Sequence, residues 1–259
     1  MILMSVLRDI FRGNRTVSEV PPAMAAAPAP IVSAAKLWTQ TPAHDRHNPE
    51  LLAFLPKDSR TIVEVGCSSG ALAKAYKEIN ADCYYMGVEI DSEYAELSRR
   101  YCDSVLNVNI EDADEEAFGS LVEADCWVFG DTLEHLKDPW SLLRRIRGSV
   151  SPDACIVACI PNAQHWSVQA ILNCGLFRYE DAGLMDRTHL RWFTRITIME
   201  LFQATGFEVI EILPRIFDEP AREAVLPAIR AMALTIGEDP DQAATDAMPI
   251  QYVIKAVPV

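Results

Sequence analysis

The chain has 259 residues, of which 50% are apolar and 23% are charged, so it is long enough to bury one sizeable core and is typical of a globular protein. Its formal net charge of −14 argues against nonspecific binding to nucleic acid, because phosphate contacts need clustered Lys and Arg side chains. We therefore expect no nucleic-acid partner.

The first 36 residues differ in composition from the rest of the chain. Residues 1–17 place apolar side chains at helical spacing with arginines nearby, which favours a short amphipathic helix that touches a membrane surface or a partner. An N-terminal helix that is frayed, or that docks on its own domain, is at least as good an interpretation. Residues 18–36 are rich in Pro and Ala, which is typical of a semi-rigid linker. We predict the folded domain over 37–259.

Strand-like and helix-like segments alternate through this domain. Apolar segments predict strands at 61–67, 83–90, 104–110, 125–132, 154–161, 207–216 and 251–259. The spacing of apolar residues predicts helices over 71–79, 93–101, 140–150, 196–205 and 221–234. Residues 162–194, which we call the lid, read as mostly irregular, and the insertion 217–249 reads as a helix followed by an acidic, alanine-rich loop. This alternation predicts an α/β fold of Rossmann-like type, with a doubly wound, mostly parallel sheet covered by helices on both faces.

The cysteines also indicate the compartment. The seven cysteines are odd in number and fall mostly inside apolar segments, and no two of them form a CxxC pair. This pattern is typical of buried thiols in a reducing compartment, not of a disulfide framework or a zinc site. No segment approaches the roughly 20 apolar residues of a membrane span, and no signal-peptide cleavage pattern is evident at the N-terminus. We expect a cytoplasmic protein, with membrane association only through residues 1–17.

The turn after the first predicted strand, in "TIVEVGCSSGALAKAY", is the first candidate ligand site. Ligands of a doubly wound sheet bind beyond the carboxyl ends of its strands, and small residues let the backbone approach them. The pattern G-C-S-S-G is shorter than G-x-G-x-x-G and lacks its middle glycine, which disfavours a pyrophosphate. Glu89 closes the second strand and could accept hydrogen bonds from a ribose diol, whereas Glu64 suits a cationic ligand and would repel a pyrophosphate.

These motifs, taken in order, resemble those of the class I, seven-strand S-adenosylmethionine-dependent methyltransferases. They are "VEVGCSSG", "GVEID", "NVNIEDADE", "CWVFGDTLEHLKDPW" and "GSVSPDACIVACIPN". The segments "IPNAQHW", "DRTHLRWFT" and "LFQATGFEV" are similar to the branch that includes MetW-like proteins and bacterial glycan-associated methyltransferases. The resemblance implies S-adenosylmethionine as cofactor and a seventh strand that runs antiparallel to the others.

The resemblance also implies roles for individual residues. The turn would line the methionine part of the cofactor, Glu89 would hold the ribose hydroxyls, and Asn109 would pair with the adenine edge. Asp131, at the end of the fourth strand, would face the methionine part or the substrate. The complete set of expected cofactor-binding residues is Glu64, Gly66, Cys67, Gly70, Glu89, Ile90, Asn109, Ile110 and Asp131.

A base that removes a proton from a hydroxyl or amine acceptor would assist methyl transfer, and histidine is the natural candidate near neutral pH. We expect His189 to be the catalytic base or a substrate contact, with His165 second. Expected substrate-binding residues are Asp186, Arg187, Arg191, Trp192 and Trp166, and Trp166, Phe177, Tyr179 and Trp192 would form an aromatic wall. For Asp186 with Arg187 or Arg191, a salt-bridged lid is the better interpretation. For the aromatic residues, packing within the lid is an equally good interpretation.

We assign no metal ligands from the sequence. His44 and His47 form an HxxH pair without a third ligand, so a solvated entry loop explains them better. Similar Glu-His loops are linked to a divalent metal in ubiquinone-type O-methyltransferases, and Asp131, Glu134 and His135 could supply such ligands here. A structural role for His135 is an equally good interpretation, so a divalent metal remains only an alternative.

The expected activity is methylation of a hydroxyl on a sugar, a glycan or a lipid-linked acceptor. The alternatives within enzymes are a quinone- or phenol-type O-methyltransferase and an N-methyltransferase. A further alternative is a noncatalytic partner protein of MetW type that binds S-adenosylmethionine. A nicotinamide-dependent enzyme is disfavoured by the spacing of the turn.

Overall fold

The computed structural model of the protein describes residues 45–121 and 124–259. The predictions for residues 1–17 and 18–36, and His44, therefore lie outside the described part of the chain. No helix within that part is long and apolar enough to cross a membrane.

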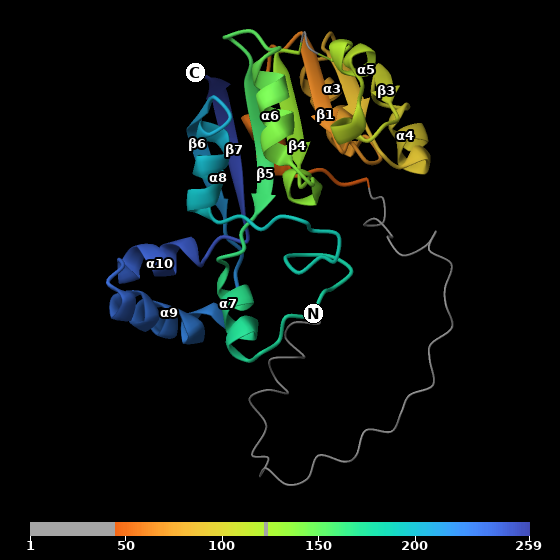
Figure 1. The fold of residues 1–259 in the computed structure, drawn as a ribbon. Coiled ribbons are helices and arrows are strands. Elements are labelled where there is room, and N and C mark those ends of the chain that lie inside the picture. The colour runs from red at the N-terminus through yellow and green to blue at the C-terminus, as the bar shows by residue number, and fades with distance from the viewer. Residues whose placement is uncertain (1–44, 122–123) are drawn as a thin grey trace, which may run out of the picture. The chain divides into compact units, whose positions relative to one another are not determined.

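The seven predicted strands form one sheet, in the order β3-β2-β1-β4-β5-β7-β6 (Figure 1). β7 pairs antiparallel with both β5 and β6, and the other paired strands are parallel. This confirms the predicted fold class, including the antiparallel last strand. The strands are β1 (Thr61–Val65), β2 (Tyr84–Val88), β3 (Ser104–Leu106), β4 (Cys126–Gly130), β5 (Cys155–Pro161), β6 (Phe207–Arg215) and β7 (Gln251–Pro258).

The chain winds outward from β1 to β3 and then returns to place β4 on the other side of β1. The order of strands therefore reverses between β1 and β4, which is where doubly wound sheets bind ligands. We call the end of the sheet where β1, β2, β4 and β5 finish the carboxyl edge.

The helices predicted from the sequence are all present, with small shifts at their ends. The described helices are α2 (Pro49–Phe54), α3 (Ala71–Ile79), α4 (Ser92–Ser98), α5 (Glu115–Gly119), α6 (Pro139–Arg147), α7 (Trp166–Asn173), α8 (Arg195–Gln203), α9 (Arg222–Ile236) and α10 (Pro240–Asp246). Two short 3-10 helices are η2 (Ile110–Asp112) and η3 (Leu133–His135).

Two of these helices correct the sequence interpretation. α7 occupies part of the lid that we expected to be irregular, and α10 forms where we expected an acidic loop. Each begins at a side chain that caps the helix: His165 accepts a hydrogen bond from the amide of Ser167, and Asp239 accepts from the amides of Asp241 and Gln242. Local capping therefore outweighs the loop-like composition of these segments.

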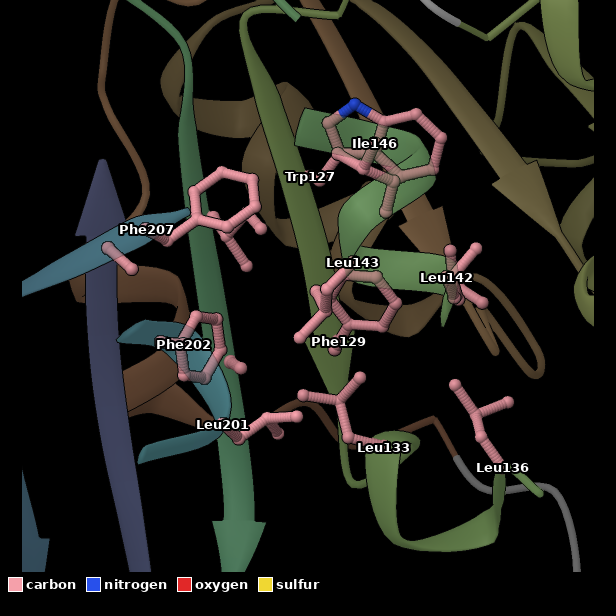
Figure 2. Close-up of a cluster of buried hydrophobic side chains, with 14 of the residues drawn as sticks. Trp127, Phe129, Leu133, Leu136, Leu142, Leu143, Ile146, Leu201, Phe202 and Phe207 are labelled. Atoms are coloured by element: carbon pink, nitrogen blue, oxygen red, sulfur yellow. The ribbon is translucent and has the colours of Figure 1, made fainter. Parts of the chain in front are cut away.

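The apolar core lies on both faces of the sheet. On one face, Trp127 and Phe129 of β4 pack against Leu143 and Ile146 of α6, next to Phe202 of α8 (Figure 2). The opposite face packs against α2 and α3 through Leu51, Leu55, Ile62, Leu72, Tyr76 and Tyr85. Because the central strands are buried on both faces, their sequences read as continuous apolar runs.

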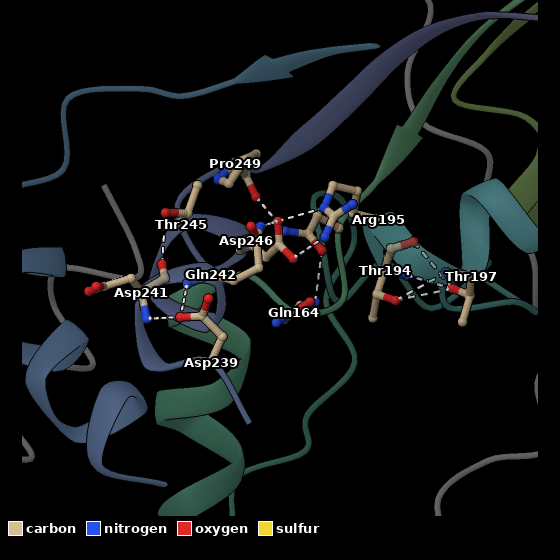
Figure 3. A network of polar contacts seen from close by, with 11 residues as sticks. Gln164, Thr194, Arg195, Thr197, Asp239, Asp241, Gln242, Thr245, Asp246 and Pro249 are labelled. Atoms are coloured by element: carbon tan, nitrogen blue, oxygen red, sulfur yellow. Dashed lines mark hydrogen bonds and ion pairs between the residues drawn. The ribbon is translucent and has the colours of Figure 1, made fainter. Parts of the chain in front are cut away.

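The helices α7, α9 and α10 lie together beyond the carboxyl edge, next to the end of β5 (Figure 1). A polar network ties them to the sheet (Figure 3). The side chain of Asn162 donates to the backbone carbonyls of Asp246 and Pro249, at 2.8 Å in both cases. Arg195, at the start of α8, donates to both carboxylate oxygens of Asp246 at 2.7 and 3.0 Å. The insertion is therefore anchored to the same edge of the sheet as the lid.

Candidate functional site

The glycine turn between β1 and α3 is closely packed against the loop after β4. Gly66 has a φ of +75°, and a Cβ atom there would lie 2.7 Å from Oγ1 of Thr132. Oγ1 of Thr132 in turn donates a hydrogen bond to the carbonyl of Val65 at 2.9 Å. Gly70 has a φ of +79°, and its Cβ would lie 3.1 Å from the Cα of Ser98. Both positions therefore require glycine, for conformation and for space.

Glu89 holds this turn in place. Its side chain is buried, and its two carboxylate oxygens accept hydrogen bonds from the amides of Ser68 at 2.8 Å and Asp91 at 2.9 Å. Ser68 has a φ of +47°, a conformation that costs a serine about 1 kcal/mol or more. Each oxygen of Glu89 keeps a second lone pair. Ile90, the next residue, is exposed.

Glu64 lies under the turn and is also buried. Tyr85 donates its hydroxyl hydrogen to Oε2 of Glu64 at 2.9 Å. Burial raises the pKa of Glu64 to about 8, the bond from Tyr85 opposes this rise, and the charge of Glu89 adds to it. Glu64 is therefore mostly protonated at pH 7, and a cation placed beside it would favour its ionised form. Cys67, within the turn, is a buried thiol whose pKa is raised, first by its contact with Cys102 and then by burial.

The expected adenine-binding residues begin η2, after the end of β3. The side chain of Asn109 accepts a hydrogen bond from the amide of Glu111 at 3.1 Å and donates to Asp112 at 2.7 Å. Ile110 is buried in the core. In this structure both residues shape the loop, and their contact with adenine remains a prediction.

Asp131 follows β4 at the carboxyl edge and has a strained backbone. Its φ of +54° is rare for a residue other than glycine, and such strain is common at functional positions. Its carboxylate accepts a hydrogen bond from Gln251, the first residue of β7. Desolvation by the surrounding chain raises the pKa of Asp131 to about 6, while Cys159 and Arg215 oppose the rise. The residue is nevertheless open to solvent, so a ligand can reach it.

Glu134 forms a compact group with two histidines, one from η3 and one from the lid. Its carboxyl group is buried, and neither oxygen has a hydrogen-bond partner among the described residues. Nε2 of His189 lies 3.9 Å from Oε1 of Glu134, and the rings of His135 and His189 meet edge to face with centroids 4.8 Å apart. One possible ligand atom from each of the three residues lies within 4.8 Å of the other two.

The backbone of Glu134 also fixes the lid. Its carbonyl accepts hydrogen bonds from the amides of Leu190 at 2.8 Å and Arg191 at 2.9 Å. Asp186 accepts from the amide and the hydroxyl of Thr188, at 2.7 and 2.6 Å. The conformation of the lid around His189 is therefore set by bonds on both sides of that residue.

His189, our first choice as catalytic base, is a weak base in this environment. Burial lowers its pKa to about 4, and the neighbouring His135 lowers it further. The side chain is only 6% exposed, which leaves little room for an acceptor to reach it. The structure thus brings His189 to Glu134 and His135, which the sequence had not paired with it.

His165, our second choice, lies elsewhere and has protein partners on both ring nitrogens. Nε2 lies 3.1 Å from Glu219, and Nδ1 lies 2.8 Å from Oγ of Ser167. Nε1 of Trp166 also donates to Glu219, at 2.8 Å. Both His165 and Trp166 are buried, because His165 caps α7 and Trp166 begins it. The structure therefore gives these two residues positions within the packing of the protein.

The remaining lid residues divide into an aromatic group and a group of polar contacts. Phe177 packs edge to face on Tyr179, with centroids 5.8 Å apart, and also contacts Trp192 at 5.9 Å. Phe177 and Tyr179 are about half exposed, so three of the four expected wall residues form a group that could accept a ring. Arg187 pairs with Asp181, and Arg191 donates to a backbone carbonyl, so neither arginine bonds to Asp186 in this structure.

Two residues that contact the site were not identified from the sequence. Thr132 contacts Gly66, and Gln251 binds Asp131. The signal for Gln251 lies in the topology, because an antiparallel strand begins at the edge where its parallel neighbours end. Thr132 could have been inferred only from its place directly after Asp131.

A cavity of about 440 Å³ lies at the opposite edge of the sheet. Its lining includes Arg60, just before β1, and Asp125, just before β4. Because the glycine turn, Asp131 and the Glu134 group all lie at the carboxyl edge, the cavity is separate from them. We therefore locate the candidate site from the polar and titratable residues at the carboxyl edge, and not from this cavity.

Comparison with known proteins identifies the family of the chain. The family described as "Methyltransferase domain" matches residues 38–212. No curated protein matches the chain in sequence.

Solved structures share the fold at low sequence identity. Mitomycin 7-O-methyltransferase is 14% identical with a TM-score of 0.51, and the match covers 81% of this chain but only 52% of that one. An S-adenosylmethionine-dependent methyltransferase from Mesorhizobium loti is 16% identical with a TM-score of 0.53, covering 81% of this chain and 96% of that one. Magnesium protoporphyrin IX methyltransferase from Synechocystis is 11% identical with a TM-score of 0.53, covering 82% and 81%. At these identities the likeness is one of fold.

Proposed function

The chain belongs to the methyltransferase-domain family and is an S-adenosylmethionine-dependent methyltransferase, and we propose that it methylates a hydroxyl group on a sugar, a glycan or a lipid-linked acceptor. The observation that carries the proposal is the glycine turn at the carboxyl edge, fixed by Glu89 and placed beside the solvent-open Asp131. Cofactor and acceptor would meet between these two features.

The turn supports a sulfonium amino acid as its ligand. Glu64 lies under the turn with a pKa raised to about 8, so the ammonium group of a bound methionine moiety would draw it toward its ionised form. The free lone pairs of Glu89 would accept hydrogen bonds from ribose hydroxyls. Asn109 and Ile110 would contact the adenine from the end of β3. In this assignment the cofactor spans the ends of β1, β2 and β3.

The acceptor would lie on the other side, between the end of β4 and the lid. Asp131 lies at this edge and is exposed to solvent. Its pKa is raised to about 6, so it is mostly ionised at pH 7 and can take a proton from a hydroxyl. We therefore assign the role of base to Asp131 and not to His189 or His165. The half-exposed rings of Phe177 and Tyr179 would pack against a sugar or another ring of the acceptor.

Isothermal titration calorimetry tests the cofactor assignment. The wild-type protein should bind S-adenosylmethionine and S-adenosylhomocysteine and should not bind NAD. Glu89→Gln should weaken the binding of both adenosyl ligands by about tenfold or more, because it removes the charge that orients the turn and faces the ribose. Glu93→Gln, an exposed change on α4, is the matched control and should bind as the wild type does. Binding of NAD alone would overturn the assignment.

A transfer assay with methyl-labelled S-adenosylmethionine tests the acceptor class. Parallel reactions should contain nucleotide sugars, a polyprenyl-linked glycan, a catechol and a primary amine. We expect label on the sugar or glycan hydroxyl. Label on the catechol would support the phenol-type alternative, and label on the amine would support N-methylation.

A further inference from the structure

Glu134 is an unusual carboxyl group in this protein. It is 1% exposed, and neither of its oxygens has a hydrogen-bond partner among the described residues. Buried carboxyl groups in folded proteins are normally paired, hydrogen-bonded or bound to a metal ion, because burial without a partner costs several kcal/mol at the order-of-magnitude level. A bound ligand could therefore provide the partner that the described protein neighbours do not provide for the carboxyl oxygens of Glu134.

The histidine rings beside Glu134 differ in their other contacts. Nδ1 of His135 lies 3.2 Å from the carbonyl of Thr188 and 3.1 Å from the hydroxyl of the same residue. Histidines that bind metals typically use one nitrogen for the metal and donate the other N–H to a backbone carbonyl or carboxylate. The contact of Nδ1 with Thr188 therefore leaves Nε2 of His135 for a ligand. Nε2 of His189 faces Glu134, at 3.9 Å from Oε1.

We propose that Glu134, His135 and His189 together bind one divalent first-row transition metal ion, for which Zn²⁺ is the best match. The ligand atoms lie within 4.8 Å of one another, and the Glu134–His189 pair is 3.9 Å apart. Zinc bonds of about 2.0–2.2 Å require ligand atoms roughly 3.4 Å apart in a tetrahedral site. Side-chain rotations that bring the ligand atoms closer by at most about 1.4 Å are therefore sufficient.

The ligand types select the class of metal. Two imidazole nitrogens and one carboxylate oxygen suit Zn²⁺ and its first-row neighbours, whereas Mg²⁺ and Ca²⁺ prefer oxygen ligands throughout. Asp131 could have added a second carboxylate, but its side chain is bonded to Gln251. The three-residue set leaves a fourth coordination position for water or for an oxygen of an acceptor.

The surrounding charges favour a cation at this place. The carboxylates of Asp131 and Asp186 both lie close enough to Glu134 to act on it with negative charge. The ion would join the lid, through His189, to η3, through Glu134 and His135. This inference goes beyond methyl transfer, and metal binding can be measured without any cofactor or acceptor.

The test uses the full chain, purified, treated with a chelator and dialysed. Calorimetry with ZnCl₂ should give one ion per chain, and Glu134→Gln and His189→Gln should each weaken that binding by about 100-fold. His47→Gln removes an exposed histidine outside the group and should leave binding unchanged. MgCl₂ should give no comparable binding. Circular dichroism and titration with S-adenosylhomocysteine report whether each variant is folded, and His135→Gln replaces any variant that is not.

A second measurement follows the position of the ion. CoCl₂ should give visible absorption bands of a nitrogen- and oxygen-coordinated Co²⁺ in the wild type and in His47→Gln, and these bands should be absent from His189→Gln. The proposal is overturned if the wild type binds no Zn²⁺, if binding persists in folded Glu134→Gln and His189→Gln proteins, or if Mg²⁺ binds as tightly as Zn²⁺.

Discussion

The two halves of the carboxyl edge are built differently. In the cofactor half, from β1 to β3, the polar groups of the turn are already bonded: both oxygens of Glu89 accept amide hydrogens, and Glu64 has Tyr85. In the half proposed for the acceptor, after β4, neither oxygen of Glu134 has a hydrogen-bond partner among the residues that the structure describes, and Asp131 carries a strained backbone. The first half is complete without a ligand, and the second is not.

This difference suits the two halves to different roles, one to cofactor binding and the other to the methyl-transfer reaction. A site that is preformed loses little entropy when its ligand binds, which suits a cofactor common to the whole family. Strained and unpartnered groups, in contrast, are common where a ligand or reacting group completes the structure. The comparison predicts that changes in the cofactor half affect folding and cofactor affinity together, whereas changes in the acceptor half affect turnover or metal binding with little effect on cofactor affinity.

The largest expected effect is on turnover, in the acceptor half. Asp131→Asn should lower kcat by about 10²–10⁴-fold, because it removes the proposed base, while the dissociation constant for S-adenosylmethionine changes little. With the pKa of Asp131 raised to about 6, kcat/KM of the wild type should fall as the pH drops below 6, and the variant should lose this dependence. Asp153→Asn, at the opposite edge, is the control. Full activity of Asp131→Asn would remove this residue from the mechanism.

A smaller effect is expected in the cofactor half. Gly66→Ala adds a Cβ atom 2.7 Å from Thr132 at a φ of +75°, so it should reduce stability by about 2–3 kcal/mol and weaken cofactor binding at the same time. Gly175 has nearly the same φ, +70°, but apart from its chain neighbours no described residue has an atom within 4 Å of the Cβ that Gly175→Ala adds. It should show only the conformational cost of about 1 kcal/mol. Thermal unfolding and calorimetry distinguish the two, and equal losses would contradict the packing argument.

The buried Glu64 predicts a pH dependence of stability. Its pKa is raised to about 8 in the folded protein, so its stabilising contribution is complete below pH 4.5, the ordinary value, and is lost as the pH rises toward 8. Glu64→Gln removes this loss and should therefore gain about 1–3 kcal/mol relative to the wild type between pH 5 and pH 8. Urea unfolding of the variant and the wild type at several pH values measures this difference in the free energy of unfolding. A difference between variant and wild type that stays constant with pH would show that Glu64 is ionised when buried.

The smallest effect is expected in the network that anchors the insertion. Asp246→Asn keeps the shape of a buried side chain but weakens two charge-assisted bonds from Arg195, so we expect a loss of about 1 kcal/mol. Asp241 pairs with Arg230 on the surface, and Asp241→Asn should leave the melting temperature unchanged. If the two variants melt at the same temperature, the Asp246 network contributes nothing beyond a surface ion pair.

The sequence was sufficient to predict the sheet because its central strands are buried on both faces. Continuous apolar runs such as Cys155–Pro161 mark such strands, and the helix at Ala71–Ile79 has the expected apolar spacing. Composition was less informative at Pro240–Asp246, where an Asp cap and a following Pro start a helix in an acidic segment. Capping depends on two or three residues at the start of a helix. The average composition of a longer segment does not reveal it.

The positions of the proposed cofactor residues at the carboxyl edge were predictable, and the contacts after β4 were not. Gly66 and Glu89 are contiguous with strands, so the motif alone placed them at this edge, and their contact with a cofactor stays a prediction. The acceptor half joins His189 to Glu134 across 55 positions of sequence, and no local pattern indicates that contact. Likewise, His165 could not be identified as a helix cap before α7 was seen.

Glu134 has two roles in this structure, one through its backbone and one through its side chain. Its carbonyl accepts the amides of Leu190 and Arg191, while its carboxyl group faces His189, so one residue both positions the lid and belongs to the group beneath it. A displacement of residues 189–191 that makes room for a larger acceptor at the proposed site would break those two bonds and separate His189 from Glu134. Engineering for bulkier acceptors at that site should therefore begin at Phe177 and Tyr179, whose contacts among the described residues are with other rings of the lid.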